Sequence, residues 1–203
     1  MSTTQTLSRE KIAAAAIAIA DAEGIVSVSM RRIAQDLGVG TMSLYYYVKT
    51  KADLIAAMDD AIMAEVVAPS LPTNWRAALV TIATRTCDAL MRHPWALHSM
   101  LSVAPGLNAM RHFEQCLEAL AQTTLTGKDK LTLLATLDDF VFGYALREAA
   151  TERKIDLDFA KAQLATGEYP RLAEVFGEGR EPVSSDRFQL GLKLILDMVA
   201  ERR

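Results

Sequence analysis

The segment of residues 28–51 constrains the fold more than any other part of this sequence. It contains two short stretches with the apolar spacing of amphipathic helices, separated by Leu37-Gly38-Val39-Gly40. Ser29 is placed to cap the first helix, because its hydroxyl can accept a hydrogen bond from an unpaired backbone N–H, and Gly38 is placed to end it. The pattern predicts two short helices joined by a tight turn, a helix-turn-helix.

The second helix is predicted over residues 41–47, with Leu44 and Val48 one turn apart on its buried side. Such a helix can enter the major groove of DNA, where residues near its N-terminus reach base edges and tyrosine hydroxyls further along bind phosphates. The side chains left facing outward are Thr41, Met42, Ser43, Tyr45 and Tyr46. A helix pair around a glycine turn also occurs in plain helical bundles. Successive helical residues point about 100° apart, however, so the three consecutive tyrosines cannot all be buried.

The composition places the chain among globular proteins. Of its 203 residues, 51% are hydrophobic, whereas disordered chains are poor in apolar side chains. No apolar run is long enough for a membrane span, and the N-terminus lacks the features of a signal peptide, so we expect a cytoplasmic protein. Cys87 and Cys116 lie in helical patterns and are expected to be reduced core residues.

The net charge of −3 is unevenly distributed along the chain. Residues 1–51 carry six basic and four acidic side chains, a net charge of +2, which leaves −5 for the remainder. The positive end coincides with the predicted helix-turn-helix, but the excess is small. Affinity for DNA would therefore have to come from a few placed contacts and from dimerisation rather than from a basic field.

Helical patterns on both sides of the motif divide the chain into two predicted domains. A first helix over residues 8–23 would pack across the motif and complete a DNA-binding domain of residues 1–50. Capping-box spacing at Thr50 starts a helix over residues 51–67, which connects this domain to the rest. Residues 51–203 form the predicted effector-binding and dimerisation domain.

All further patterns are helical, so the predicted fold is all-α. The expected helices run over residues 74–93, 95–103, 107–125, 128–152 and 157–165, and a last one is capped by Ser184 and Ser185. Apart from its short helix, the segment of residues 151–182 is expected to be irregular. The helix over 128–152 and the last helix are apolar over more of their circumference than one packing partner explains. Two interpretations remain open: a four-helix interface between two copies of the chain, or two central helices of a monomer.

The stretch from Ile12 to Met58 resembles the DNA-binding domain of the tetracycline-repressor (TetR) family. The resemblance lies in Ala22-Glu-Gly, in Ile33-Ala-Gln-Asp-Leu-Gly-Val and in Leu44-Tyr-Tyr-Tyr-Val-Lys-Thr-Lys-Ala-Asp-Leu. It implies a homodimer whose reading helices enter successive major grooves of a palindromic operator, and a C-terminal domain that holds an effector. It also implies repression that ends when the effector selects a conformer with moved reading helices, although some relatives activate transcription.

The resemblance also implies which side chains meet DNA. Thr41, Met42 and Ser43 fall where family members touch bases, and Met42 can offer only an apolar contact, for instance to a thymine methyl. Arg31 falls where a side chain often reaches a base or a phosphate. The positions that match backbone-contacting residues of the family are Tyr45, Tyr46 and Lys51.

Groups capable of catalysis or metal binding form only weak patterns. His112 and Cys116 are one helical turn apart, His93 and His98 are separated by a proline, and Asp138-Asp139 is an acidic pair. Partly buried histidines and cysteines are usually ordinary core residues. No nucleophile elbow, phosphate loop or dinucleotide fingerprint is present. We therefore expect no enzyme activity, no metal and no cofactor.

A small-molecule binding site is a more plausible role for the histidines and their aromatic neighbours than catalysis or metal binding. The candidates mix apolar surface with a few polar groups on the central helices of the second domain: Trp95, His98, Met100, His112, Phe113, Cys116, Phe140 and Tyr144. Core packing is the alternative for each of them, but together they predict a cavity for a small, mainly apolar effector. The sequence thus favours a ligand-responsive regulator, most simply a repressor. A helical small-molecule carrier without DNA function and a helical enzyme remain as alternatives.

Overall fold

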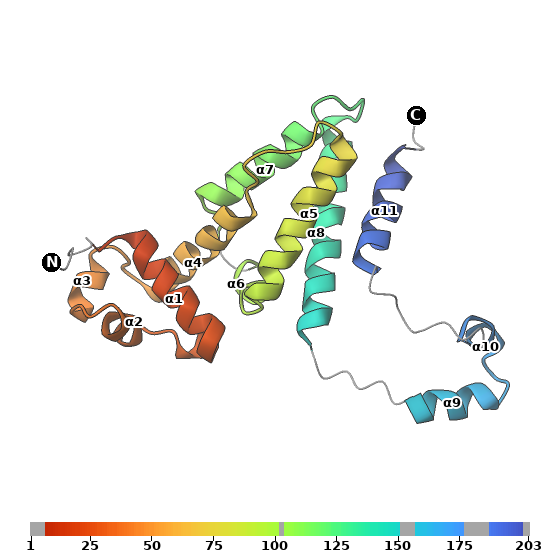
Figure 1. Ribbon diagram of the computed structural model, residues 1–203, viewed down its shortest axis with the longest axis horizontal. Coiled ribbons are helices and arrows are strands. Elements are labelled where there is room, and N and C mark those ends of the chain that lie inside the picture. The colour runs from red at the N-terminus through yellow and green to blue at the C-terminus, as the bar shows by residue number, and fades with distance from the viewer. Residues whose placement is uncertain (1–6, 102–103, 151–156, 177–186, 201–203) are drawn as a thin grey trace. The chain divides into compact units, whose positions relative to one another are not determined.

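A computed structural model of the chain describes residues 7–101, 104–150, 157–176 and 187–200. Every regular element in these ranges is a helix, which confirms the predicted all-α class (Figure 1). None of these described helices has the length and apolar character needed to span a bilayer. The elements are α1 (Arg9–Glu23), the 3-10 helix η1 (Ile25–Ser27), α2 (Met30–Asp36), α3 (Thr41–Tyr45), α4 (Lys51–Val66), α5 (Trp75–Arg92), α6 (Ala96–Ser99), α7 (Leu107–Ala119), α8 (Gly127–Ala149), α9 (Leu157–Ala165), α10 (Pro170–Phe176) and α11 (Arg187–Ala200).

The chain forms two compact units, Met1–Ala149 and Ala150–Arg203. Helices α1 to α8 belong to the first unit and α9 to α11 to the second, and each unit is described by itself. The first unit therefore contains both the helix-turn-helix and the helices that follow it. The domain boundary after residue 50 stays a prediction.

The first two helices begin and end where their capping residues predict. The Ser8 hydroxyl accepts from the Lys11 backbone N–H at 3.3 Å at the start of α1, and the Ser29 hydroxyl accepts from the Arg32 backbone N–H at 3.2 Å at the start of α2. Gly38 follows α2 with φ +65°, a left-handed conformation that residues with a Cβ rarely adopt. The turn of the motif therefore depends on this glycine.

Helix α3 is shorter than predicted, ending at Tyr45 instead of Tyr47. The backbone N–H groups of Tyr47 and Val48 both donate to the Leu44 carbonyl at 2.9 Å, which tightens the last turn and ends the helix. Val48 is fully buried at this point. The chain then enters α4 through the predicted capping box, in which Thr50 and Asp53 exchange hydrogen bonds of 3.0 and 3.1 Å.

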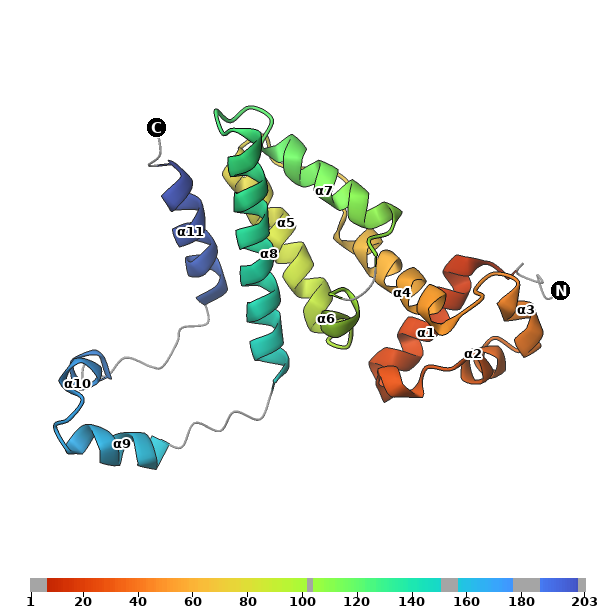
Figure 2. The same cartoon turned by 180° about the vertical axis from the view of Figure 1, so that it is seen from behind.

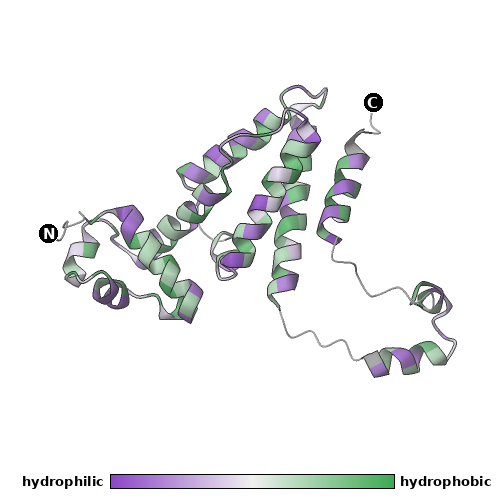
Figure 3. Cartoon of the chain, in the orientation of Figure 1, coloured by the Kyte–Doolittle hydropathy of each residue, from purple (hydrophilic) through white to green (hydrophobic). Residues whose placement is uncertain are grey.

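Helices α1 to α4 share one apolar core. On α1 the middle of the helix is hydrophobic and the two ends are hydrophilic (Figure 3), which matches a helix that crosses the others with its central turns. The buried members of this core are Ile12, Ala15, Ala16, Ile19, Ala20, Val28, Ile33, Ala34, Leu44, Val48, Leu54 and Met58. Because the last two lie on α4, this helix is part of the core that holds the helix-turn-helix.

Helix α4 runs from α1–α3 to α5–α8 (Figures 1 and 2). At its C-terminal end the Arg85 guanidinium donates to three backbone carbonyls, those of Glu65, Val66 and Val67. The Gln115 amide both accepts from the Ala68 N–H at 3.0 Å and donates to the Ala68 carbonyl at 2.7 Å. Side chains of α5 and α7 thus satisfy backbone groups that the end of α4 would leave unpaired.

Two helices after α5 are several residues shorter than predicted, and α8 ends at Ala149 whereas its helix was expected to reach residue 152. The helix expected over residues 95–103 is the four-residue α6, and residues 102–103 lie outside the described part. The helix expected over 107–125 ends at Ala119, because turn hydrogen bonds close residues 120–123 and Thr126 then pairs with Asp129 to start α8. Helix α8 packs along α5, and α7 packs on α4 and α5.

In the second unit, α9 lies where it was predicted and α10 corrects the prediction of an irregular segment. Helix α10 begins at Pro170, whose fixed φ suits a first helical position, but seven residues are too few to show a clear apolar period. The predicted caps Ser184 and Ser185 lie outside the described residues. On α11, one set of apolar residues is buried, namely Phe188, Leu192 and Leu196, and another is exposed, namely Leu190, Leu194 and Met198.

Candidate functional site

The short helix α3 presents a sharply divided surface. Leu44 is fully buried in the shared core, whereas Met42 is 81% exposed and Tyr46 is 83% exposed. Ser43 is also exposed, and Thr41 is half-buried at the first position of the helix. One side of α3 is therefore anchored, and the predicted base-reading side chains occupy the other.

The three consecutive tyrosines divide in the way that helical geometry requires. Tyr45 and Tyr46 are exposed, and Tyr47 packs against the core of α1–α4. The rings of Tyr46 and Tyr47 meet edge to face with their centroids 5.2 Å apart. The partly buried Tyr47 therefore supports the exposed Tyr46 at the position predicted for a phosphate contact.

Two neighbouring arginines on α2 have different surroundings. Arg32 pairs with Glu23 at 2.8 Å and with Asp36 at 3.5 Å, and the hydrogen bond to Glu23 raises the pKa of its guanidinium. Arg31 is exposed, and Lys51 is exposed at the first turn of α4. Arg32 thus holds α2 to the end of α1, while Arg31 and Lys51 lie on the surface.

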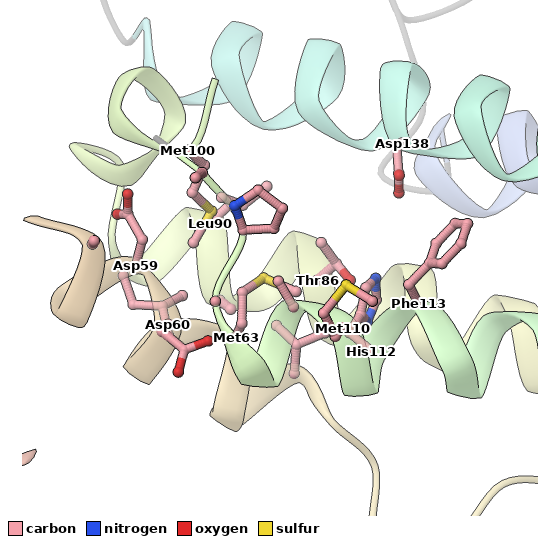
Figure 4. A pocket seen from close by; sticks show the side chains of 18 of the residues that line it. Asp59, Asp60, Met63, Thr86, Leu90, Met100, Met110, His112, Phe113 and Asp138 are labelled. Atoms are coloured by element: carbon pink, nitrogen blue, oxygen red, sulfur yellow. The ribbon is translucent and has the colours of Figure 1, made fainter. Parts of the chain in front are cut away.

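A cavity of about 450 Å³ opens among α4, α5, α7 and α8, a size suited to a drug-sized ligand (Figure 4). Of the eight residues predicted to line an effector site, three line this cavity: Met100, His112 and Phe113. They come from the loop after α6 and from α7, and Met63 of α4 and Met110 of α7 lie beside them in the lining. Most of the wall is apolar, as predicted.

The other five predicted residues lie outside this cavity. Cys116 lines a separate space of only about 20 Å³, and His98 is exposed on α6. Phe140 and Tyr144 contact each other one turn apart on α8, with ring centroids 6.3 Å apart. Trp95 packs against the core of α1–α4 instead. The sequence predicts which helices these residues occupy, but it does not predict the direction in which each side chain points.

Trp95 belongs to a polar junction between α1 and the α5–α6 corner. Its indole N–H donates to Asp21 Oδ1 at 2.7 Å, and the same oxygen lies 2.8 Å from Nδ1 of the buried His93. The other ring nitrogen of His93 lies 3.7 Å from a Glu65 oxygen on α4. This junction connects the helix-turn-helix side of the unit with the cavity side.

Both cysteines are buried and free, as predicted. Burial raises the pKa of Cys87 to about 11 and that of Cys116 to about 12, so both remain thiols at neutral pH. Cys116 Sγ lies 3.8 Å from His112 Nε2. Within the described residues, no three His, Cys, Asp or Glu side chains gather as a metal site would require.

Sequence reasoning missed two aspartates of α4 that line the cavity, Asp59 and Asp60. Asp59 is only 7% exposed, and its Oδ1 accepts a hydrogen bond from the Ser99 hydroxyl at 2.7 Å. Its Oδ2 is buried and accepts no hydrogen bond from the described part of the chain. Desolvation raises the pKa of Asp59 from 3.8 to about 6, against the lowering effect of Ser99. Two adjacent acids inside an apolar helical stripe were the available signal.

Asp60 links α4 to the start of α7. Its Oδ1 accepts from the Asn108 backbone N–H at 2.7 Å, and its Oδ2 accepts from the Asn108 amide at 3.0 Å. A side chain of one helix thus caps the N-terminus of another. Gly106 permits this approach, because a Cβ there would lie 2.2 Å from Asp60 Oδ1.

Asp138 of α8 and His112 of α7 complete the titratable lining of the cavity. Asp138 is open to the cavity, yet the surrounding protein raises its pKa to about 6 through desolvation and, second, through the charge of Asp139. Burial lowers the pKa of His112, so its ring favours the neutral form. Asp59 and Asp138 lie at opposite ends of the labelled side chains in Figure 4.

The chain is similar to known proteins in family, in sequence and in structure. The family model of bacterial regulatory proteins of the tetR family matches residues 12–58, and that of the tetracyclin repressor-like C-terminal domain matches residues 68–203. The chain is 37% identical to the HTH-type transcriptional repressor DrrR1 of Streptomyces coeruleorubidus, over 98% of this chain and 80% of the relative. It is 25% identical to the tetracycline repressor protein class E of Escherichia coli, over 94% of this chain and 89% of the relative.

Two solved structures of ActR from Streptomyces coelicolor are similar to this chain. Apo ActR is 28% identical with a TM-score of 0.79, and the match covers 94% of this chain and 93% of ActR. ActR in complex with actinorhodin is 25% identical with a TM-score of 0.79, and the match covers 97% of each chain. The similarity therefore extends over both units of the chain.

Proposed function

This chain belongs to the TetR family of bacterial regulatory proteins, and we propose that it represses transcription by binding a palindromic operator as a homodimer until an effector releases it. One observation carries the proposal. Helix α3 exposes its reading side chains while its buried Leu44 belongs to a core that continues into α4, and α4 lines the cavity. The helix proposed to read DNA and a helix that lines the cavity therefore share one core.

The exposed face of α3 supports a division of labour toward DNA. We propose that Thr41, Met42 and Ser43 meet base edges, because they occupy the first turn of the reading helix. The tyrosine hydroxyls and the two surface cations are suited to the phosphate backbone, which fixes register without reading sequence. The proposed backbone contacts are Arg31, Tyr45, Tyr46 and Lys51, with Arg31 also able to reach a base.

Exposed apolar residues on α8 and α11 support the homodimer. Leu131 and Leu146 of α8 are 53% and 51% exposed, and on α11 Leu194 is 59% and Met198 is 70% exposed. Leucines and methionines repeated along exposed helix faces are typical of association surfaces. Two copies joined there would present two reading helices, which need a separation of about one DNA turn, 34–36 Å, to occupy successive major grooves.

The cavity is the proposed effector site. An effector would act by binding more tightly to a conformer in which α4 has moved, since only a difference in affinity can shift the population. Movement of α4 would reach the reading helix through the core shared by Leu54 and Met58 with Leu44. Support for a ligand at this place comes from the cavity itself, and support for a small-molecule effector comes from ActR, whose structure has been solved in complex with actinorhodin.

The test uses DNA that flanks the gene, searched for a palindrome and examined by gel shift. We expect binding that weakens steeply with salt, because counterions are released from the phosphates. Tyr45→Ala should weaken binding to every sequence alike, and Ser43→Ala should change the preference at particular base pairs. If the two variants behave alike across single-base operator variants, the division between positioning and reading residues is wrong.

The same samples test the dimer and the alternative function. Sedimentation at micromolar concentration should give twice the chain mass of 22.2 kDa. A monomer would remove the geometry that places two helices in successive grooves. Ligand binding without any sequence-specific shift would favour a small-molecule carrier over a repressor.

A further inference from the structure

The cavity is apolar over most of its wall, and its charge is of one sign. Its titratable lining residues are Asp59, Asp60, Asp138 and His112, and burial favours the neutral form of the histidine. None of the described residues that line it is a lysine or an arginine. An anionic ligand would therefore meet carboxylates without a cation to pair with, whereas a cationic ligand would meet its counter-charge.

The three aspartates are not equivalent. Asp60 is committed to the N-terminus of α7, where both of its oxygens accept hydrogen bonds from Asn108. Asp59 is 7% exposed and is held by the Ser99 hydroxyl through Oδ1 alone. Its Oδ2 is buried and has no donor in the described part of the chain, and the residue is part of the cavity lining. Buried polar atoms in native proteins are nearly always paired, so this oxygen requires a donor.

A metal ion is a poor candidate for that donor. A bound divalent cation takes several oxygen ligands, and no group of three acidic or histidine side chains is close enough within the described residues. The opposite end of the cavity carries Asp138 from α8, with Phe113 beside it (Figure 4). An organic cation can satisfy this geometry, because it brings its own N–H donors together with an apolar body.

We propose that the effector is an amphipathic organic amine whose ammonium group donates to Oδ2 of Asp59 while its apolar body lies against Met63, Met110 and Phe113. The inference rests on the proposed function, in which this cavity is the effector site. Methionine side chains are flexible and polarisable, so they fit an aromatic or aliphatic body without demanding one shape. Asp138 adds a second negative charge that favours a cation anywhere along the cavity.

In this assignment the ligand contacts α4 directly, because Asp59 lies on that helix. The ammonium would pair with a carboxylate that lies one residue from the Asp60 cap and on the same helix as Leu54 and Met58. A neutral ligand of the same shape would fill the cavity but leave Asp59 Oδ2 unpaired. The positive charge of the ligand therefore distinguishes an effector from a neutral molecule of the same shape.

The test uses three dansyl sulfonamides that carry the same alkyl chain ending in an ammonium, a methyl or a carboxylate group. Fluorescence titration of the full chain at neutral pH and without DNA measures their affinities. We expect the ammonium probe to bind at least about tenfold more tightly than the methyl probe, because a charge-assisted hydrogen bond exceeds a neutral one, and the carboxylate probe to bind most weakly.

Asp59→Asn is the variant that assigns the contact, because an asparagine keeps the volume and an oxygen for the Ser99 hydroxyl. It should remove most of the preference for the ammonium probe and leave binding of the methyl probe unchanged. Asp138→Asn should reduce the preference by a smaller factor. Asp88→Asn is the matched control, since it removes the same charge from an exposed position of α5 outside the cavity lining.

The outcomes separate the two levels of the proposal. Equal binding of the methyl and ammonium probes to the unmodified chain, which needs no variant to fold, would overturn the inference and leave the effector site in place. Tighter binding of the carboxylate probe, or a preference that Asp59→Asn leaves undiminished, would overturn it in the same way. Binding of none of the three probes would overturn both the inference and the assignment of the cavity as the effector site.

Discussion

The DNA-reading region and the cavity are built by contacts of different range. In α1–α3 the polar contacts that set the helices join residues three apart, such as Ser8 with Lys11 and Ser29 with Arg32. Around the cavity they join residues 40 to 48 apart, such as Asp59 with Ser99 and Asp60 with Asn108. The first region is specified by its own segment, and the second exists only once distant helices have met.

The two regions also use polar groups in opposite ways. On α3 most of the side chains proposed to contact DNA are exposed, and their partner would be DNA that approaches from solvent. In the cavity the polar groups are few, and Asp59 is buried and incompletely paired, so its protonation depends on what surrounds it. Binding at the exposed face of α3 therefore depends mainly on where its side chains lie. Binding in the cavity depends on the positions of the side chains and on their charge.

The largest expected effect tests how much the buried Leu44 of α3 contributes to the stability of the fold. Leu44→Ala should lower the free energy of unfolding by about 2–5 kcal/mol, because it leaves a void in the core shared by α1–α4. Met42 lies two residues away and is 81% exposed, so Met42→Ala should change the free energy of unfolding by no more than about 0.5 kcal/mol. Urea unfolding at fixed protein concentration measures both. Equal effects would contradict the division of α3 into an anchored and a free side.

The next prediction tests the long-range contacts around the cavity. Gly106→Ala should cost about 1–3 kcal/mol, because a Cβ would push against the Asp60 carboxylate and displace the cap of α7. Its backbone, with φ −86°, suits alanine, so the cost would come from the contact and not from backbone strain.

Gly127→Ala is the matched control for Gly106→Ala, since a Cβ there meets nothing within 4 Å. The control should leave the urea midpoint nearly unchanged. Effector binding, measured by fluorescence titration, should weaken in Gly106→Ala alone. A Gly106→Ala variant as stable as the control would mean that the Asp60 cap contributes little to the fold.

The difference in contact range explains what the sequence could predict. Three helix starts were predictable, because the capping side chain at each one accepts a hydrogen bond from a residue three positions later. These caps are Ser8, Ser29 and Thr50. The end of α3 was not, because it depends on Val48 turning into a core that includes α1. Local rules specify where a helix begins better than where tertiary packing ends it.

The cavity shows the same limit more strongly. Met100, His112 and Phe113 were predicted to line it, yet Trp95 has the same character in sequence and faces Asp21 of α1 instead. Asp59 was missed because it lies in an otherwise apolar stripe of α4, where an acid looks like an exception. Its role depends on Ser99, 40 residues away, and no local pattern reports that distance.

The smallest expected effect concerns pH and separates the cavity from the reading surface. The pKa of Asp59 rises from 3.8 to about 6 on folding, so the folded chain binds a proton more tightly than the unfolded chain. The stabilisation from this site is complete below pH 3.8 and is lost as pH rises through about 6. Asp59 is faced by Ser99 of α6, and the other titratable groups of the cavity are Asp60, Asp138 and His112.

The side chain in Asp59→Asn cannot titrate, so the thermal midpoint of this variant should gain on that of the unmodified chain as pH is raised from 4 to 7. This window begins just above the pKa of 3.8 and ends above the raised pKa of about 6. The gain should be smaller than either effect above, because water in the open cavity screens part of the charge. The exposed Asp88→Asn should follow the unmodified chain across this range. A difference that stays constant with pH, or that reverses sign, would show that the Asp59 carboxylate is ionised at little cost. The burial of its unpaired oxygen would then be no obstacle to an uncharged ligand.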